Sequence, residues 1–219
     1  VQVDEEKIPQ SIDLLPQTAE RDLEEEQQAA AGLLRGDVET EARGGEIYRY
    51  SNGQGWVQFH SDGTFSAQLE PGVYSAGEEQ TAGCLAALAA MGFAGTQLKE
   101  TEDGSIVQQT WDTTPLFGQQ ANVVCVDGSV STITGRRLVG QPKPDPARET
   151  ITAPTALIRF LNGISALGDV CNRIDTIETG YLCAASLSGS MTLTPVWQIT
   201  TDIGTYQLDT VTGSVWRVE

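Results

Sequence analysis

A short sequence motif that occurs twice constrains the fold more than any other feature of this chain. In both places a Thr-Pro-apolar-aromatic run is followed, one strand later, by a Gly-Ser-Val turn, and an apolar helix-like run comes first. The two copies are Thr114–Phe117 with Asp127–Val130, and Thr194–Trp197 with Thr212–Val215. In both copies the order is helix, strand, Thr-Pro-apolar-aromatic motif, turn and strand. This recurring order indicates one small structural unit used in tandem. We therefore predict an α+β fold, in which tandem repeats of a helix followed by an antiparallel β-meander each pack the helix on one face of the sheet.

Three amphipathic or apolar runs predict helices. The first begins near Thr18 and extends to Leu34, with Gly36 placed to end it. Glu78 and Glu79 open the second, which ends at Gly92, because acids are favoured at the positive end of a helix. The third covers residues 153–168.

Alternating apolar and polar residues between turn signals predict the strands. Asn-Gly and Asp-Gly pairs separate the first three of them, which is typical of an antiparallel meander. The predicted strands cover residues 47–50, 56–59, 64–69, 96–99, 106–111, 121–126, 130–133, 174–184, 191–200, 205–208 and 215–218.

Prolines at every second position mark a linker at residues 140–149, because Pro142, Pro144 and Pro146 remove hydrogen-bond donors and favour an extended spacer. The predicted organisation has three other parts. They are an acidic N-terminal helix with short antiparallel strands (1–77), the first helix-plus-sheet repeat (78–139) and the second repeat (150–219).

The charge is strongly negative, with 30 Asp and Glu against 13 Lys and Arg and a formal net charge of -17. Residues 1–46 carry 13 of the acids and only 4 of the bases. A field of this sign repels phosphate backbones and anionic membrane surfaces, so we exclude nucleic acid as a partner. No run of 18 apolar residues predicts a membrane span.

The residues that usually carry chemistry form no constellation, so we predict no catalytic, cofactor-binding or metal-binding residue. His60 is the single histidine, and we interpret it as a surface loop residue after a strand. Asp-Gly pairs at positions 62, 103 and 127 lack the further oxygen ligands of a calcium loop and are interpreted as turns. With 30 acids, some carboxylate pair is always available, so a glycosidase gains no support.

Cysteines and tryptophans leave alternatives open. We interpret Cys84 and Cys125 as small core residues. Cys171 and Cys183 flank a strand and are compatible either with free thiols or with a disulfide. Tryptophans at strand positions suit either core packing or a carbohydrate-binding platform; they are Trp56, Trp111, Trp197 and Trp216.

The C-terminal part resembles the C-terminal domain of the YycH/YycI regulatory proteins. Gly180-Tyr181, Pro195-Val196-Trp197, Tyr206 and Gly213-Ser214-Val215 are the matching positions. Residues 48–69 and 114–135 are similar to the central domain of that family, with PepSY-type units as a related group, and the likeness covers about residues 44–219. The chain begins at Val1, which we interpret as a trimmed or processed end.

The resemblance implies an extracytoplasmic protein, tethered by an N-terminal membrane helix that the chain lacks, which contacts a membrane histidine kinase and restrains it. We therefore expect a non-enzymatic interaction or regulatory protein with a protein partner. The alternative is a PepSY-like protease inhibitor or chaperone module that binds an extended segment at a sheet edge. A third reading, a cell-wall hydrolase, requires a groove that holds an acid with a raised pKa.

Overall fold

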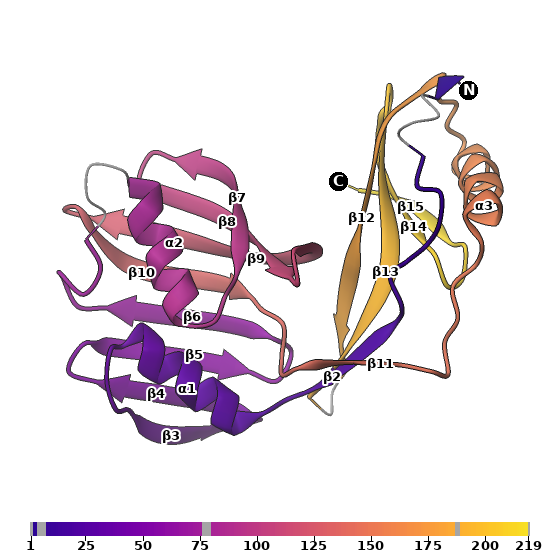
Figure 1. The fold of residues 1–219 in the computed structure, drawn as a ribbon. Coiled ribbons are helices and arrows are strands. Elements are labelled where there is room, and N and C mark those ends of the chain that lie inside the picture. Colours follow the sequence, from indigo (N-terminus) through magenta and orange to yellow (C-terminus); the bar gives the residue numbers. More distant parts are fainter. Residues whose placement is uncertain (1, 4–7, 76–79, 187–188, 219) are drawn as a thin grey trace. The chain divides into compact units, whose positions relative to one another are not determined.

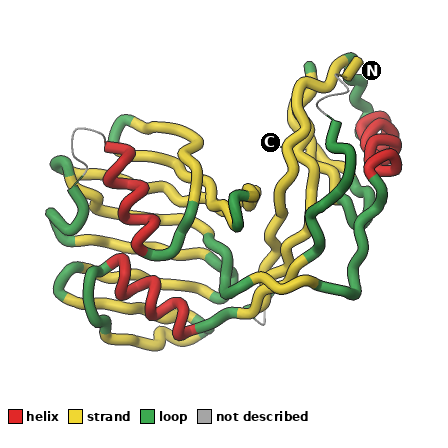
Figure 2. Tube along the Cα trace, viewed as in Figure 1, coloured by secondary structure: helices red, strands yellow, loops and turns green. Residues whose placement is uncertain are grey.

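A computed structural model describes residues 2–3, 8–75, 80–186 and 189–218. The chain divides into two compact units, which are described separately. The central unit comprises Ala19–Pro142 with Cys183–Met191, and the terminal unit comprises Val1–Thr18, Lys143–Leu182 and Thr192–Glu219. Strands account for 50% of the residues and helices for 17% (Figure 2).

The central unit is built on a run of eight antiparallel strands. Their order is β7-β8-β9-β10-β6-β5-β4-β3, so the strands from both halves of this segment share one sheet. The bounds are β3 Glu39–Gly44, β4 Ile47–Asn52, β5 Gly55–His60, β6 Thr64–Leu69, β7 Gly95–Thr101, β8 Gly104–Trp111, β9 Thr114–Val126 and β10 Ser129–Arg136. The pairing of β6 with β10 joins residues more than 60 positions apart, at Ala67 and Ile133.

Two helices, α1 (Leu23–Leu33) and α2 (Gln80–Ala90), cover one face of this sheet (Figure 1). Asp22 caps α1 by accepting hydrogen bonds from the backbone N–H groups of Glu24 and Glu25 at 2.9 and 3.2 Å. The helices approach each other at Gly32, where an added Cβ would lie 2.0 Å from the carbonyl oxygen of Ala90. Only a residue without a side chain fits this crossing.

The core of the central unit lies between these helices and the sheet. It contains apolar side chains from α1 and α2 and from alternate positions of the strands. Tyr50, Phe59, Phe65 and Phe93 form a chain of tilted ring contacts with centroids 6.0 to 6.2 Å apart. Because every second strand residue enters this core, the residues between them lie on the opposite, helix-free face.

The terminal unit has one helix and a mixed sheet. Helix α3 (Ala153–Ala166) precedes β12 (Arg173–Ala185), β13 (Ser190–Thr201), β14 (Gly204–Asp209) and β15 (Val215–Arg217), which are neighbours in that order. Strand β1 (Gln2–Val3) pairs with β12 in parallel. Two short strands, β2 (Gln17–Glu20) and β11 (Pro142–Pro144), complete the inventory of described elements. Phe160 of α3 packs on Tyr206 of β14 with ring centroids 6.0 Å apart.

The predicted tandem repeat of a helix and its own meander is wrong. Residues 78–139 do not form a separate sheet, because β10 pairs with β6 and so joins the strands of 39–69. Residues 150–219 differ again, because their sheet takes in β1 from the other end of the chain. The repeated motif also occupies unlike places: Thr114 and Pro115 begin β9, whereas Thr194 and Pro195 lie within β13.

Most individual elements were nevertheless predicted close to their observed positions, with a few differences. Strand β3 was missed because its sequence is charged and its residues are exposed. The first helix begins at Leu23, because residues 17–20 form β2 instead. The left-handed residue after that helix is Arg35 (φ 52°), followed by Gly36. The expected opening of the second helix at Glu78 and Glu79 lies outside the described residues.

Across the described ranges, no helix combines the length and the apolar character needed to cross a membrane.

Candidate functional site

The helix-free face of the central sheet, here called the open face, consists of the strand residues that point away from the core. Cross-strand register places Arg49, Gln58, Ser66, Thr134 and Asn122 in one row, from β4 to β9. A second row runs from Trp56 through Gln68 and Thr132 to Val124. Amide and hydroxyl groups therefore dominate the centre of this face.

The distribution of acids around the open face is unusual for so acidic a chain. The six inner strands of the run, β4, β5, β6, β8, β9 and β10, contain neither Asp nor Glu, although the chain has 30 such residues. The acids of this region occupy the turns between strands, for example Asp62, Asp103 and Asp127. The basic side chains Arg49 and Arg136 on the open face therefore have no acidic neighbour within the inner strands, although Glu41 of edge strand β3 is the cross-strand neighbour of Arg49.

Arg49 and Trp56 form the most organised contact on this face. The guanidinium carbon of Arg49 lies 4.0 Å from the centre of the Trp56 ring. The same guanidinium donates to the Gln58 side-chain oxygen at 3.1 and 3.3 Å. The Gln58 amide nitrogen is in turn 3.1 Å from Nε2 of His60. These contacts hold an aromatic ring, a cation and an imidazole in fixed positions on neighbouring strands.

Asp62, in the turn after β5, favours its charged form. Partial burial acts to raise the pKa of Asp62, but hydrogen bonds from the Thr64 hydroxyl and N–H at 2.6 and 2.9 Å outweigh it. Arg136 and His60 add favourable charge, so the pKa of Asp62 falls below its ordinary value. Asp62 is thus a charged turn residue whose Oδ1 accepts both hydrogen bonds from Thr64.

Both edges of the run of strands are protected against pairing with another strand. Edge strand β3 carries Glu39, Glu41 and Arg43, and Arg43 pairs with Glu41 at 2.8 Å. Edge strand β7 carries Lys99 and Glu100 and has an irregular register between Gln97 and Lys99. Charges and bulges of this kind discourage strand addition.

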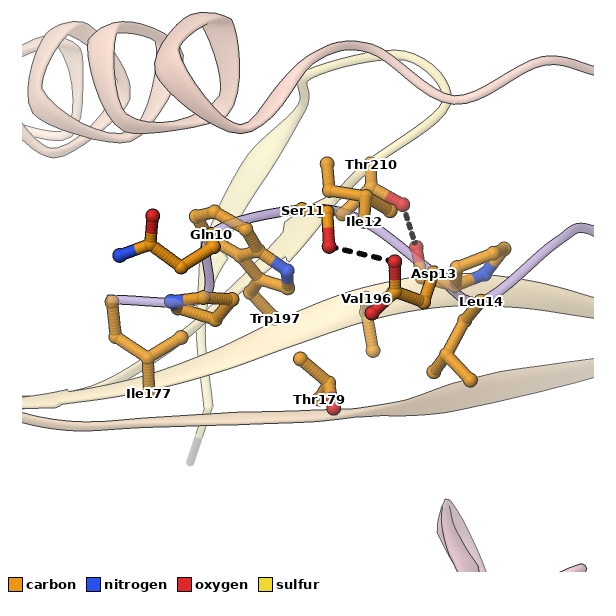
Figure 3. A pocket seen from close by; sticks show the side chains of 12 residues that line it. Gln10, Ser11, Ile12, Asp13, Leu14, Ile177, Thr179, Val196, Trp197 and Thr210 are labelled. Carbon is orange, nitrogen blue, oxygen red and sulfur yellow. Dashed lines mark hydrogen bonds between the residues drawn. The ribbon is translucent and has the colours of Figure 1, made fainter. Parts of the chain in front are cut away.

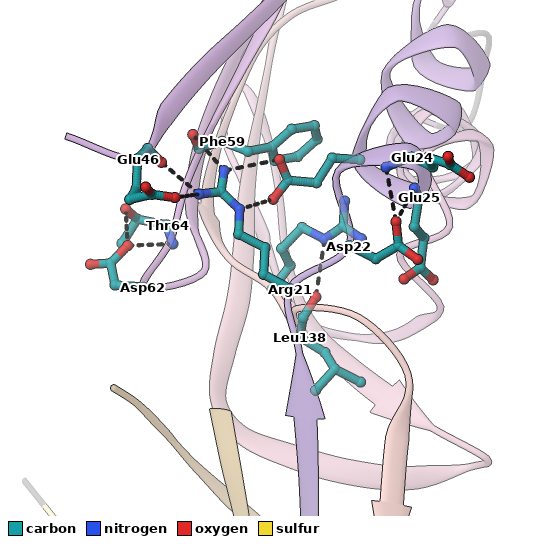
Figure 4. A network of polar contacts seen from close by, with 11 residues as sticks. Arg21, Asp22, Glu24, Glu25, Glu46, Phe59, Asp62, Thr64 and Leu138 are labelled. Atoms are coloured by element: carbon teal, nitrogen blue, oxygen red, sulfur yellow. Dashed lines mark hydrogen bonds and ion pairs between the residues drawn. The ribbon is translucent and has the colours of Figure 1, made fainter. Parts of the chain in front are cut away.

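A polar network beneath the helices is structural (Figure 4). The Arg21 guanidinium donates to both carboxylate oxygens of Glu26 at 2.7 and 2.9 Å, and also to the carbonyl oxygens of Glu46 and Phe59. Arg137 is 91% buried, donates through Nε to the Leu138 carbonyl oxygen and stacks on the Phe59 ring at 4.9 Å. Its burial lowers the pKa of Arg137, while Glu25 and Glu26 raise it.

The terminal unit has a pocket of about 470 Å³ between residues 9–14 and the sheet (Figure 3). Its walls combine apolar residues, among them Ile177 of β12 and Val196 and Trp197 of β13, with a few polar groups. Ser11 donates to Asp13 at 2.6 Å at the rim. The buried Trp197 indole nitrogen has no hydrogen-bond partner among the described residues.

The structure corrects one interpretation of a single residue. His60 is the last residue of β5 and half-buried, not a surface loop residue. The Asp-Gly pairs at 62, 103 and 127 do lie in turns, as predicted. The sequence reasoning missed the open face, although the absence of acids from the strand-like segments was visible in the sequence and signals it.

The four cysteines are free thiols, and Cys171 and Cys183 do not form the disulfide that we left open. The sulfur atoms of Cys84 and Cys125 lie 3.7 Å apart in the core of the central unit. Burial raises the pKa of the Cys84 thiol to about 12, and its contact with Cys125 adds to this. Within the described ranges, no group of three or more His, Cys, Asp and Glu side chains is arranged to hold a metal ion.

Three of the four tryptophans occupy different kinds of position. Trp197 is buried in the terminal core, Trp56 lies on the open face, and Trp216 donates to the Gln207 side chain at 3.2 Å. Packing was therefore the right interpretation for Trp197.

Comparisons with known proteins give no functional information. No family model and no curated protein matches the chain. An uncharacterized protein from Eubacterium rectale ATCC 33656, known from its crystal structure, is similar over 94% of this chain and 86% of its own, with 9% identity and a TM-score of 0.48.

Proposed function

We propose that the chain is a non-enzymatic interaction protein that binds a protein partner through the open face of its central unit. The observation that carries the proposal is the acid-free, amide-rich surface of the six inner strands, with the Arg49–Trp56 pair at one side. Trp and Arg are the side chains that most often dominate binding energy at protein interfaces. Their mutual contact and the Gln58 hydrogen bonds reduce the ordering that binding requires.

Charge supports this choice of surface. Acids in turns, in helices and on edge strand β3 repel other acidic proteins, whereas the six inner strands of the open face add no such repulsion. A partner that meets this face buries neutral amides and hydroxyls, which exchange hydrogen bonds with water for hydrogen bonds with the partner. The partner class that we propose is the extracytoplasmic part of a membrane histidine kinase or its accessory protein. We further propose that the chain works outside the cytoplasm, tethered to the membrane.

Strand addition, the mode of the inhibitor or chaperone alternative, is less well supported. It needs an exposed edge with free backbone groups, and charges on β3 and the irregular register of β7 oppose it. A carboxylate-based hydrolase is also less well supported. Asp62 and Asp202 both have a pKa below the ordinary value, in each case because hydrogen bonds outweigh desolvation, whereas a general acid needs a raised pKa.

Site-specific photo-crosslinking in the cells that naturally produce the protein tests the proposal. A photoreactive amino acid replaces Ser66 or Thr134, which are cross-strand neighbours at the centre of the open face. We expect one discrete adduct from each position, containing the same protein. The matched control is Gln27, an exposed residue of α1 on the helix-covered side.

The identity of the captured protein separates the readings. A histidine kinase or its accessory protein would support the regulatory role, and exported proteases or unfolded clients would support the alternative. Equal adducts from Gln27, or none from either open-face position, would reject the open face as the binding surface.

A further inference from the structure

The pocket of the terminal unit has the features of a ligand site that is independent of the open face. It is formed by the segment 9–14, by β12 through Ile177 and Thr179, and by β13 through Pro195–Trp197. Its volume of about 470 Å³ lies within the range of small-molecule and peptide sites. Figure 3 shows the side chains of Ser11 and Asp13 beside the Trp197 ring.

The Trp197 N–H is the group in this pocket that most clearly needs a partner. Trp197 is 99% buried, and its Nε1 donates to no acceptor among the described residues. Two other polar groups nearby are engaged: Ser11 donates to Asp13, and Thr210 donates to the Pro195 carbonyl oxygen at 2.7 Å. A buried donor without an acceptor is unfavourable, and a ligand oxygen placed here would remove that penalty. In Figure 3 the indole nitrogen lies on the side of the ring that faces Ser11 and Asp13.

The other residues that line the pocket indicate which further chemical groups the ligand should have. Ile12, Leu14, Ile177 and Val196 supply apolar contacts for an aliphatic group. The Asp13 carboxylate is exposed at the rim and accepts from Ser11 through Oδ1. A carboxylate at the rim of a pocket, in a chain of net charge -17, repels anionic ligands and favours cationic ones.

We propose that this pocket binds a short peptide segment in which an aliphatic residue is next to a basic residue. The peptide carbonyl oxygen accepts from the Trp197 N–H, the aliphatic side chain contacts Ile177 and Val196, and the basic side chain pairs with Asp13. A peptide supplies an acceptor, an apolar group and a cation within two residues, which is the combination that the walls present.

The test uses the full chain, labelled with nitrogen-15, and the probe N-acetyl-leucyl-lysine amide. The indole N–H resonance of Trp197 is assigned by its loss in Trp197→Phe, and the backbone amides of Thr179 and Val196 report independently if that variant does not fold. We expect saturable shifts of these resonances with the lysine probe. N-acetyl-leucyl-glutamate amide, which differs only in its charged end, should bind at least tenfold more weakly.

Asp13→Asn should weaken binding of the lysine probe about tenfold, which corresponds to one charge-assisted hydrogen bond. The matched control, Asp127→Asn, changes an exposed turn acid of the central unit and should leave binding unchanged. Absence of shifts with the lysine probe would overturn the site. Equal binding of the two probes, or an unchanged affinity in Asp13→Asn, would overturn the assignment of a basic ligand. None of these outcomes depends on the partner of the open face.

Discussion

Arg21 and Glu26 form a two-pronged ion pair, with nitrogen-to-oxygen distances of 2.7 and 2.9 Å, and each side chain is only 7% exposed. The pair connects the segment before α1 to the helix itself, and Arg21 also donates to the carbonyl oxygens of Glu46 and Phe59. Glu26 therefore neutralises a cation that is held between α1 and the sheet.

Replacement of this carboxylate should destabilise the central unit strongly. In Glu26→Gln the Arg21 guanidinium keeps its burial but loses its buried counter-charge and keeps only the exposed Glu46 carboxylate at 3.8 Å, so we expect a loss of about 3–5 kcal/mol in the free energy of unfolding. Urea denaturation measures it. Glu24→Gln, an exposed change in the same helix turn, should stay within about 0.5 kcal/mol of the parent. A similar small effect in both variants would contradict the structural role of the pair.

Introduction of an acid on the open face should abolish partner binding without loss of stability. Ser66→Glu and Thr134→Glu, made singly because these residues are cross-strand neighbours, each place a negative charge where the inner strands have none. Surface substitutions of this kind change stability by about 0.5 kcal/mol or less. The measurement is recovery of the cross-linked partner together with the melting temperature. Gln27→Glu on α1 should leave recovery unchanged; undiminished recovery in both face variants would count against the proposed surface.

Trp197 should contribute to the stability of the terminal core mainly through its ring. We expect Trp197→Ala to lose about 3–5 kcal/mol, because it removes a fully buried aromatic side chain. Trp197→Phe should lose less, since it keeps an aromatic ring and removes an N–H that lacks an acceptor. Thermal unfolding of both variants tests this order. A larger loss in Trp197→Phe than in Trp197→Ala would contradict the dominant contribution of the ring, since both changes remove the N–H.

The buried thiol of Cys84 should make stability fall in alkaline solution. Its pKa is raised from 9.0 to about 12 on folding, so between these pH values the unfolded chain releases a proton that the folded chain retains. The unfolded state then binds fewer protons, and stability decreases as the pH rises above about 9. Cys84→Ala should show a shallower decrease in urea unfolding between pH 8 and 11. An unchanged slope would contradict the raised pKa.

Local sequence patterns predicted strands β4, β5 and β6 well, but they did not predict the strands that pair with this meander. Strands β4, β5 and β6 were recognised because aromatic and β-branched residues alternate between Asn-Gly and Asp-Gly turns. Strand β3 was missed, because Glu39 to Gly44 offers no apolar face to recognise. The pairing of β6 with β10 is set by burial of Ala67 and Ile133 under the helices, and no local pattern encodes such a distant register.

The open face could be predicted from the sequence only in part, for a related reason. Each polar residue of these strands, taken alone, has the pattern of an ordinary solvent-facing strand position. Only the assembled sheet brings Gln58, Ser66, Thr134 and Asn122 into one row. The role of Trp197 in a pocket also depends on residues 9–14, which are far from β13 in the sequence.

Gly32 has a consequence for the side of the sheet that it does not touch. Helix α1 packs on β4 and β5, whereas α2 packs on β7 to β10. The close contact between Gly32 and Ala90 therefore connects the two halves of the sheet through the helices on its covered face. The separation of the two helices thereby limits how far the sheet between them can flatten or bend. The curvature that a partner meets on the open face is thus governed by the absence of a side chain at one position of a helix on the other side.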